Sequence, residues 1–349
     1  MPFDSGDFDA HERVLFVADR PSGLRAIVAI HDTRLGPAIG GCRARAYASE
    51  AEAVADVLRL SRGMTYKAAC SGLPFGGGKS VVLLRPGQSL HAGMLRALGG
   101  AIEQLRGDYI TGEDMGTSSQ DMATLREVTR HVMGAPADLG GSGDPSASTA
   151  FGCLVGMRAA VRRRFGRETL RGLRVAVQGL GHVGWRLCEL LATEGAVLLV
   201  ADVREDIVRR AEHLFGATAV PSDRIAQCEA DVYAPCALGG TLDETSIAQL
   251  QAGVVAGAAN NQLRTAADAD RLAARGILYA PDYVINAGGM VQLGLEHLGR
   301  LRELQPRLQG IGDTLEQVFA DAERHGTSTA AAADALAQER LAAAGAPRG

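Results

Sequence analysis

Two lysines and an aspartate in the first half of the chain could carry proton-transfer chemistry. Lys67 ends a segment of helical apolar period, and Lys79 follows three glycines beside an apolar run. Two ammonium groups that lie close together in a partly apolar site oppose each other's protonation, which can leave one lysine neutral and basic. Asp114 follows a short apolar pair, and its carboxylate could exchange protons or neutralise a lysine. Taken singly, each lysine could also be a solvated surface residue, and Asp114 a turn or cap residue.

The glycines before Lys79 do not have the spacing of a nucleotide-hydrolysing loop. The pattern G-x-x-x-x-G-K-[ST] requires its first glycine at Leu73, whereas the glycine is Gly72. A loop of that kind also follows a strand and opens a helix, while we expect these glycines to precede the strand 79–84. The sequence therefore argues against nucleotide hydrolysis.

A second glycine-rich loop follows a predicted strand over 174–178 and opens a predicted helix over 183–194. Asp202 ends the next predicted strand, where a carboxylate accepts hydrogen bonds from ribose hydroxyls. This context predicts a dinucleotide site for NAD rather than NADP, a preference that Arg204 weakens. A glycine turn without a ligand, a flavin site and an S-adenosylmethionine site are the alternatives. The loop has the spacing G-x-G-x-x-G and consists of Gly179, Leu180, Gly181, His182, Val183 and Gly184.

Apolar runs that alternate with segments of helical period predict an α/β protein. Ser49 and Glu52 have the spacing of a capping box and predict the start of a helix. The segment 134–148, rich in Gly, Pro, Ser and Asp, is expected to lack regular structure and to act as a hinge. The predicted strands are 24–30, 79–84, 174–178, 196–202, 230–236, 253–259 and 276–281, and further helices are predicted over about 89–105, 118–132 and 149–164 and near the C-terminus.

Composition and charge argue against several classes of protein. The 349 residues allow about two domains of ordinary size, and 46% hydrophobic and 22% charged residues are typical of globular proteins. A net charge of −4 lacks the basic surface that nucleic-acid binding needs. No apolar run approaches the roughly 18 residues of a membrane span, and the start does not resemble a signal peptide. The six cysteines lack the spacing of a metal site. We expect a cytoplasmic protein that binds no metal, nucleic acid or membrane.

A series of segments along residues 10–330 resembles the glutamate/leucine/phenylalanine/valine dehydrogenase family, and its leucine, valine and phenylalanine branch in particular. The resemblance implies an N-terminal α/β domain for substrate binding and oligomerisation over 1–135. It also implies a C-terminal Rossmann-type domain that binds NAD over 136–325, with a helix and tail over 326–349 that pack back near the hinge. The segments are GPAIGGCR (36–43), MTYKAACSGLPFGGGKSVV (64–82), YITGEDMGT (109–117), GLGHVG (179–184), APCALGG (234–240), GAANNQL (257–263) and YAPDYVINAGG (279–289).

The resemblance implies a reversible, NAD-dependent oxidative deamination of an L-amino acid to a 2-oxo acid and ammonia. By motif, Lys67 would bind the substrate carboxylate and Lys79 would be the base that activates water. Asp114 would exchange protons with the amino group, and Asn260 would contact both the substrate and the nicotinamide ribose. Besides the glycine-rich loop, the implied cofactor site comprises Asp202, Thr149, Cys236, Ala237, Asn260 and Asn286.

The side-chain pocket implied by the resemblance is apolar and offers no cation to a second carboxylate, which argues against glutamate. Phenylalanine enzymes of the family tend to have smaller residues at two of its positions, so a branched aliphatic substrate such as leucine or valine is favoured. Methionine is flexible and can make room for a ring, so a phenylalanine dehydrogenase is the alternative. A NAD-binding protein without catalysis is a more remote one, and a homo-oligomer is expected. The implied pocket residues are Ile39, Gly40, Met64, Met290 and Leu293.

Overall fold

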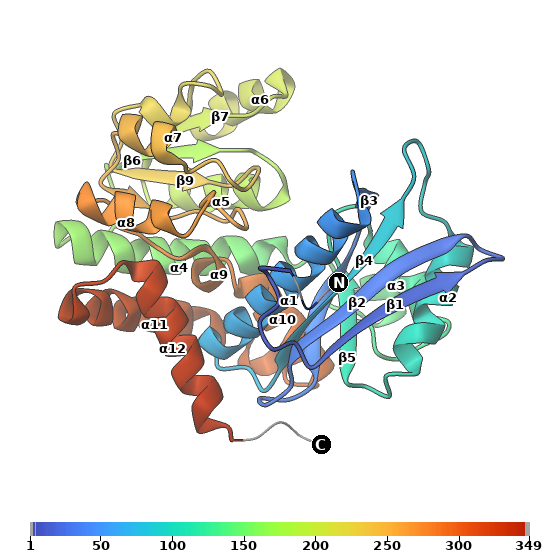
Figure 1. Ribbon diagram of the computed structural model, residues 1–349. Coiled ribbons are helices and arrows are strands. Elements are labelled where there is room, and N and C mark those ends of the chain that lie inside the picture. Colours follow the sequence, from blue (N-terminus) through green and yellow to red (C-terminus); the bar gives the residue numbers. More distant parts are fainter. Residues whose placement is uncertain (1–2, 4, 346–349) are drawn as a thin grey trace. The chain divides into compact units, whose positions relative to one another are not determined.

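The computed structural model describes residue 3 and residues 5–345, which fall into two compact units (Figure 1). Unit 1 comprises the N-terminal part of the chain up to Asp144, residues 292–301 and the C-terminal part from Ala337. Unit 2 comprises residues 145–291 and 302–336. The predicted domains, 1–135 and 136–325, divide the chain differently, because two short segments after residue 291 return to unit 1. Residues 346–349 of the predicted tail lie outside the described residues.

Unit 1 is built on a five-stranded mixed sheet in the order β1-β2-β4-β3-β5. The pairs β1–β2 and β2–β4 are antiparallel, whereas β3 pairs in parallel with both β4 and β5. The predicted strands 24–30 and 79–84 are confirmed as parts of β2 and β4. The three glycines before Lys79 are the first residues of β4, and β1 and β3 were not predicted. The strands are β1 (Arg13–Asp19), β2 (Leu24–Asp32), β3 (Ala38–Ala46), β4 (Gly76–Leu84) and β5 (Tyr109–Glu113).

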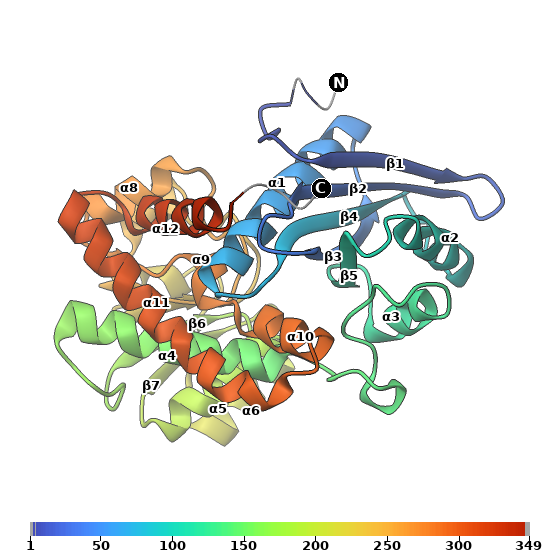
Figure 2. The ribbon, with the colours of Figure 1, turned by 90° about the horizontal axis from the view of Figure 1, so that it is seen from below.

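Helices cover both faces of this sheet (Figure 2). Successive residues of a strand point to opposite faces, so Ile27 of β2 packs in one cluster with Val57 of α1, and Val28 in another with Leu98 of α2. The Ser49 hydroxyl accepts from the Glu52 amide at 3.1 Å, as predicted, but the Glu52 carboxylate bonds to the Ala48 amide rather than to that of Ser49. The helices are α1 (Glu50–Cys70), α2 (Ala92–Glu103) and α3 (Ser119–Arg126), the last being shorter than predicted.

The end of the chain also packs in unit 1. Helix α12 (Thr329–Ala343) runs from unit 2 into unit 1, as does α10 (Gly288–His297). The Arg340 guanidinium of α12 donates to the carbonyl oxygens of Ala69 and Cys70 at 2.9 and 2.7 Å. These bonds satisfy carbonyl groups that the last turn of α1 leaves without helical partners.

Unit 2 contains a six-stranded sheet in the order β11-β10-β9-β6-β7-β8, in which all paired strands are parallel. Counted from β6, this is the order 3-2-1-4-5-6 of a doubly wound dinucleotide-binding fold. In such a sheet the ligand crevice lies where the order reverses, beyond the carboxyl ends of β6 and β9. The strands are β6 (Arg174–Gln178), β7 (Val197–Ala201), β8 (Thr218–Ala219), β9 (Val232–Pro235), β10 (Val254–Val255) and β11 (Leu278–Tyr279).

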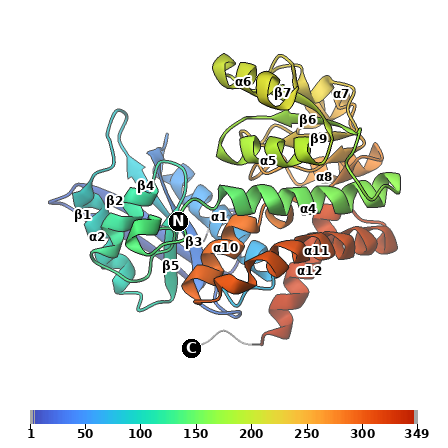
Figure 3. The ribbon, with the colours of Figure 1, turned by 180° about the vertical axis from the view of Figure 1, so that it is seen from behind.

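The longest helices of unit 2, α4 and α11, lie side by side (Figure 3). Helix α4 begins at Ser146, inside the segment 134–148 that we expected to lack regular structure, and a short 3-10 helix at Ala137–Leu139 lies there as well. Among the described residues, none of the helices combines the length and the hydropathy of a membrane span. The helices are α4 (Ser146–Phe165), α5 (His182–Thr193), α6 (Glu205–Phe215), α7 (Glu244–Gln249), α8 (Ala267–Ala274), α9 (Asp282–Ile285) and α11 (Leu304–His325).

Candidate functional site

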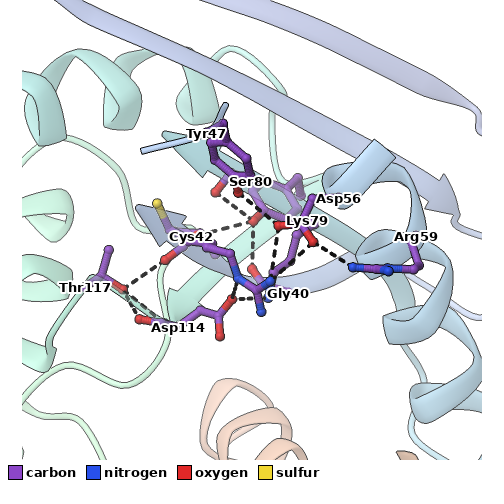
Figure 4. Close-up of polar contacts among 12 residues, drawn as sticks. Gly40, Cys42, Tyr47, Asp56, Arg59, Lys79, Ser80, Asp114 and Thr117 are labelled. Carbon is purple, nitrogen blue, oxygen red and sulfur yellow. Dashed lines mark hydrogen bonds and ion pairs between the residues drawn. The ribbon is translucent and has the colours of Figure 1, made fainter. Parts of the chain in front are cut away.

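Lys79 and Asp114 form a buried ion pair in unit 1 (Figure 4). Strand β3 lies between β4 and β5, and its Cys42 pairs with Ser80 of β4 on one side and with Glu113 of β5 on the other. The neighbouring residues Lys79 and Asp114 therefore reach each other across β3, with Lys79 Nζ 2.8 Å from Asp114 Oδ2. Lys79 is only 5% exposed and the Asp114 side chain 19%, so this pair is largely shielded from water.

Arg43 is a second cation on the same carboxylate oxygen. Its Nε donates to Asp114 Oδ2 at 3.0 Å, and its NH1 donates to both oxygens of Asp56 at 3.1 and 3.3 Å. Burial alone would raise the pKa of Asp114, but Lys79 and Arg43 more than offset this effect and hold that pKa well below its usual range. Asp114 is therefore ionised. Arg43 was not among the predicted site residues, although it ends the motif 36–43.

The network continues from Asp56 towards the surface. Asp56 accepts from the Tyr47 hydroxyl at 2.9 Å and from the Arg59 guanidinium at 3.1 Å. Burial, with the Asp56 charge next, raises the pKa of Tyr47 well above its usual value, so its hydroxyl stays a donor. Arg59 is 61% exposed, whereas Asp56 is buried. In this network Arg43 contacts Asp114, whereas Arg59 faces solvent.

The turn after β5 holds the main chain of Asp114 in place. The Asp114 amide donates to the Thr117 hydroxyl at 3.0 Å, and that hydroxyl lies 2.9 Å from the Cys42 carbonyl oxygen. Thr117 thereby ties the loop that carries the carboxylate to strand β3. This geometry limits how far Asp114 can move relative to Lys79 and Arg43.

Helix α1 brings the other predicted residues of unit 1 to the sheet. A Cβ at Gly40 would lie 1.8 Å from the Gly78 carbonyl oxygen and 3.3 Å from Met64 Cγ, so Met64 packs directly on main chain. Lys67 lies one turn after Met64 and is half-buried. Of the 36 lysines and arginines in the sequence, only Lys67 and Lys79 are lysines.

The remaining predicted substrate residues are divided between the units. Ile39 of β3 is fully buried, and Leu293 of α10 lies in unit 1, where its Cδ2 is 3.5 Å from the place of a Cβ on Gly134. Met290 and Asn260 belong to unit 2.

The glycine-rich loop of unit 2 follows β6 at the reversal of strand order. Gly179 has a φ of +95°, and a Cβ there would lie 2.7 Å from Ala237 Cβ. A Cβ at Gly184 would lie 2.0 Å from the Gly179 carbonyl oxygen, whereas at Gly181 the place of a Cβ has no heavy atom of the other described residues within 4 Å, its chain neighbours aside. Close packing therefore leaves no room for a side chain at Gly179 or Gly184. At Gly181 the main chain is open to a ligand.

The residues after Gly181 begin helix α5, with His182 and Val183 in its first turn. The first amide groups of a helix lack helical acceptors, and the helix dipole makes this end positive. Both properties suit a pyrophosphate. Cys236, at the carboxyl end of β9, lies on the other side of the loop, its Cβ 3.2 Å from the place of a Cβ on Gly184. Burial raises the pKa of the Cys236 thiol to about 11, so this small side chain is uncharged where it packs against the loop.

Asp202 lies at the end of β7 and is tied to the loop. Its Oδ2 accepts from the Leu180 amide at 2.7 Å, and its Oδ1 accepts from the Arg204 amide and Nε at 3.0 and 3.2 Å. Burial opposes the charge of Asp202, but these hydrogen bonds outweigh it and lower its pKa. A carboxylate has about four acceptor positions, so Asp202 keeps capacity for a ribose hydroxyl.

Asn260 and Asn286 lie together in unit 2. The Asn286 side-chain amide donates to Asn260 Oδ1 at 2.8 Å and to the Ala258 carbonyl oxygen at 3.1 Å. Its own Oδ1 is buried and has no hydrogen-bond partner among the described residues, which costs about 1–3 kcal/mol. Thr149 lies against the start of α10, with its Oγ1 2.7 Å from the place of a Cβ on Gly289. An unpartnered acceptor at this position fits a cofactor whose carboxamide can donate a hydrogen bond.

A doubly wound unit with an open glycine-rich loop, together with a second unit that holds a buried lysine–aspartate pair, is the combination expected of a two-domain dehydrogenase. Residues 11–131 match the family described as Glu/Leu/Phe/Val dehydrogenase, dimerisation domain, and residues 140–212 and 197–349 match Glutamate/Leucine/Phenylalanine/Valine dehydrogenase. The chain belongs to this family of amino-acid dehydrogenases, whose members use a nicotinamide cofactor.

Relatives of this chain carry several substrate names. It is 48% identical over 332 residues to a leucine dehydrogenase from Geobacillus stearothermophilus, covering 95% of this chain and 90% of the relative. It is 43% identical over 341 residues to a phenylalanine dehydrogenase from Bacillus thermotolerans, covering 96% and 89%. Among solved structures, the L-tryptophan dehydrogenase from Nostoc punctiforme matches with a TM-score of 0.83 and 41% identity, covering 96% of this chain and 97% of that chain.

Proposed function

We propose that this protein catalyses the reversible, NAD-dependent oxidative deamination of an apolar L-amino acid, with leucine and valine as preferred substrates. The observation that carries the proposal is the buried pair of Lys79 and Asp114 with its second cation, Arg43. A carboxylate that stays ionised beside a buried lysine suits a reaction in which protons move between water, an amine and the protein.

Three side chains of unit 1 have separate roles in the reaction. Lys67 binds the substrate carboxylate as a fixed cation. Lys79, in its neutral form, takes a proton from the water that attacks the imine carbon. Asp114 is ionised, so it first accepts a proton from the substrate amino group and then returns it to the departing ammonia. NAD, when bound, would supply the acceptor for the hydride of the substrate α-carbon.

The residues of unit 2 support NAD as the cofactor. The glycine-rich loop and the start of α5 bind the pyrophosphate, and Asp202 accepts hydrogen bonds from the adenosine ribose and repels a 2′-phosphate. At the nicotinamide end, Asn286 Oδ1 accepts from the carboxamide, which supplies the partner that this buried oxygen lacks. Thr149, Asn260, Cys236 and Ala237 complete this site.

The preference for a branched aliphatic side chain rests on the predicted pocket. Ile39 and Met64 are large and apolar, and Gly40 exposes main chain that has no room for a substituent. Met290 of unit 2 and Leu293 of unit 1, the other predicted pocket residues, are apolar as well. The higher identity to a leucine dehydrogenase than to a phenylalanine dehydrogenase supports this choice.

Oxidation of NADH in the presence of ammonia and a panel of 2-oxo acids tests the proposal. The expected result is that 4-methyl-2-oxopentanoate and 3-methyl-2-oxobutanoate have a higher kcat/KM than phenylpyruvate, and that NADH is used better than NADPH. A preference for phenylpyruvate would favour the aromatic alternative. Absence of turnover with every 2-oxo acid would leave a NAD-binding protein without catalysis.

A homo-oligomer is part of the proposal. The matched family description names a dimerisation domain within residues 11–131. Strand β1 lies at the edge of the sheet of unit 1, and its Phe16 is 52% exposed. Such an edge can pair with a second chain. Sedimentation of the purified protein measures the assembly, and a monomer would contradict this part. The cytoplasmic location remains a prediction from the sequence.

A further inference from the structure

Arg43 shares one carboxylate oxygen with the lysine that the proposed function makes a base. We propose that Arg43, held by Asp56, is a positioning residue. Its permanently charged guanidinium stays beside the Asp114 carboxylate as a counter-ion, so that Lys79 can lose its proton. This inference rests on the proposed function and adds Arg43 and Asp56 to the machinery of the same site.

The geometry gives the two cations different roles. Lys79 Nζ and Arg43 Nε lie 2.8 and 3.0 Å from the same atom, Asp114 Oδ2. With Lys79 alone, loss of the lysine proton would leave a buried carboxylate without a counter-ion, and such an uncompensated charge is costly. The ion pair would thus hold Lys79 in its charged form. With Arg43 present, Asp114 keeps a cationic partner whether Lys79 is charged or neutral.

Arginine suits this position for two reasons. A guanidinium remains protonated over the whole working range of an enzyme, so its charge does not respond to the loss of the neighbouring proton. Its planar fork also bonds to two carboxylates at once, with Nε on Asp114 and NH1 on Asp56. The Arg43 side chain is only 12% exposed, and the buried Asp56 balances its charge. A lysine could supply the charge but could not span both carboxylates.

The other titratable groups around the pair do not supply a cationic counter-ion for Asp114. On the strands, burial raises the pKa of Cys42 to about 11 and that of Tyr109 well above its usual value, so both stay neutral. Tyr47, after β3, stays neutral in the same way. Of the charged groups on the packed helices, Asp56 of α1 bonds to Arg43, and Asp121 of α3 acts electrostatically on Cys42 beside the pair. Arg59 and Lys67 of α1 are exposed and half-buried, and Glu113 of β5 is exposed.

The pH dependence of turnover tests this inference in the whole enzyme. The acidic limb of kcat for oxidative deamination, at saturating amino acid and NAD, reports the base in the complex. Arg43→Gln is expected to move this limb to higher pH by about one unit or more, because Asp114 then holds the lysine proton. Arg59→Gln is the matched control, since it removes a cation from Asp56 without touching Asp114. It is expected to leave the limb in place.

A second measurement reads Lys79 directly and needs no activity. Since the chain has two lysines, competitive acetylation with acetic anhydride followed by peptide mass spectrometry gives the neutral fraction of Lys79 at each pH, with Lys67 as internal reference. The midpoint for Lys79 is expected to rise in Arg43→Gln and to stay unchanged in Arg59→Gln. Should Arg43→Gln not fold, Arg43→Lys takes its place, with a smaller rise expected because the bond to both carboxylates is lost.

An unchanged Lys79 midpoint in the Arg43 variant, or an equal shift in Arg59→Gln, would overturn the inference. Lower kcat without a shifted limb would show a merely structural role and would overturn it as well. Failure of the proposed function has a different signature, namely a wild-type protein that oxidises no amino acid whatever the Lys79 midpoint is.

Discussion

Asp114→Asn and Lys79→Met break the same buried ion pair, yet we expect them to differ in stability. Lys79→Met leaves Asp114 with Arg43, whose Nε remains 3.0 Å from Oδ2. At an effective dielectric constant of 20, two unit charges at this distance attract each other by about 6 kcal/mol, so Arg43 alone can keep the carboxylate ionised. Methionine is also apolar and of similar length, and removal of one partner is costly chiefly because it leaves an uncompensated buried charge, which Arg43 prevents here. The free energy of unfolding should fall by only about 1 kcal/mol.

Asp114→Asn leaves Lys79 buried without that carboxylate and with Arg43 nearby. The lysine then gives up its proton when the protein folds. An unperturbed lysine titrates near pH 10.4, so folding in the neutral form costs about 1.36 kcal/mol for each pH unit below that value. The cost is about 4.6 kcal/mol at pH 7 and about 1.9 kcal/mol at pH 9. Because the unfolded variant binds one proton more than the folded one, the stability of the variant rises with pH.

Urea unfolding followed by circular dichroism at pH 7 and pH 9 measures both effects. Each variant is compared with the wild type at the same pH and the same protein concentration, because assembly contributes to apparent stability. Between the two pH values the free energy of unfolding of Asp114→Asn should rise by about 2.7 kcal/mol relative to that of Lys79→Met, which has no lysine at this position. Equal stabilities of the two variants at pH 7, or a difference between them that stays the same at pH 9, would refute the reasoning.

Three further changes probe the chemistry and the loop. Lys79→Ala should lower kcat by about 10²- to 10⁴-fold and keep NADH affinity, and a near-normal kcat would exclude Lys79 as the base. Gly184→Ala should weaken both stability and NADH binding, because its Cβ would lie 2.0 Å from the Gly179 carbonyl oxygen, whereas Gly181→Ala should weaken only NADH binding because its Cβ meets open space. Equal stability of the two alanine variants would contradict this assignment. NADH should change the fluorescence of Trp185, which follows the loop in the first turns of α5, and a titration without change would count against the loop as the site.

Local patterns were sufficient for the parts of the fold and site that depend on neighbouring residues. The strand 174–178 was predicted with the bounds of β6, because a buried parallel strand is a short apolar run between turn signals. The loop that follows it has a fixed glycine spacing. Lys79 and Asp114 were named from residue type and position, and they form an ion pair in the structure.

Strand β3 could not be predicted from its own residues. It contains two adjacent glycines and two arginines, which disfavour a strand by local preference. It is a strand because β4 and β5 pair with it on both sides, and Gly40 allows the close approach of the Gly78 carbonyl. This pairing alone brings Arg43 to Asp114, which is 71 residues further along the chain. Arg43 was therefore missed together with its strand.

The division into units also depends on contacts between distant parts of the chain. Residues 292–301 and the chain from Ala337 return to unit 1, but nothing in their composition marks the change. Helices α10 and α12 continue through the points where the chain passes between units. A boundary inside a helix leaves no turn signal, whereas the boundary at Asp144 lies within the Gly- and Pro-rich segment 134–148.

The near absence of lysine has a consequence for the surface of the protein. Ion pairs such as Arg174–Glu229 and Arg162–Glu316 carry a guanidinium, which keeps its charge to about pH 12, whereas ammonium groups discharge from about pH 10. Raising the pH from 8 to 10 therefore leaves the positive surface charge and its ion pairs nearly intact. The side-chain amines in the sequence are those of Lys67 and Lys79, both residues of the proposed site. Alkaline solution therefore does not weaken the cationic surface through loss of ammonium charge, as it does in a protein whose surface cations are mostly lysines.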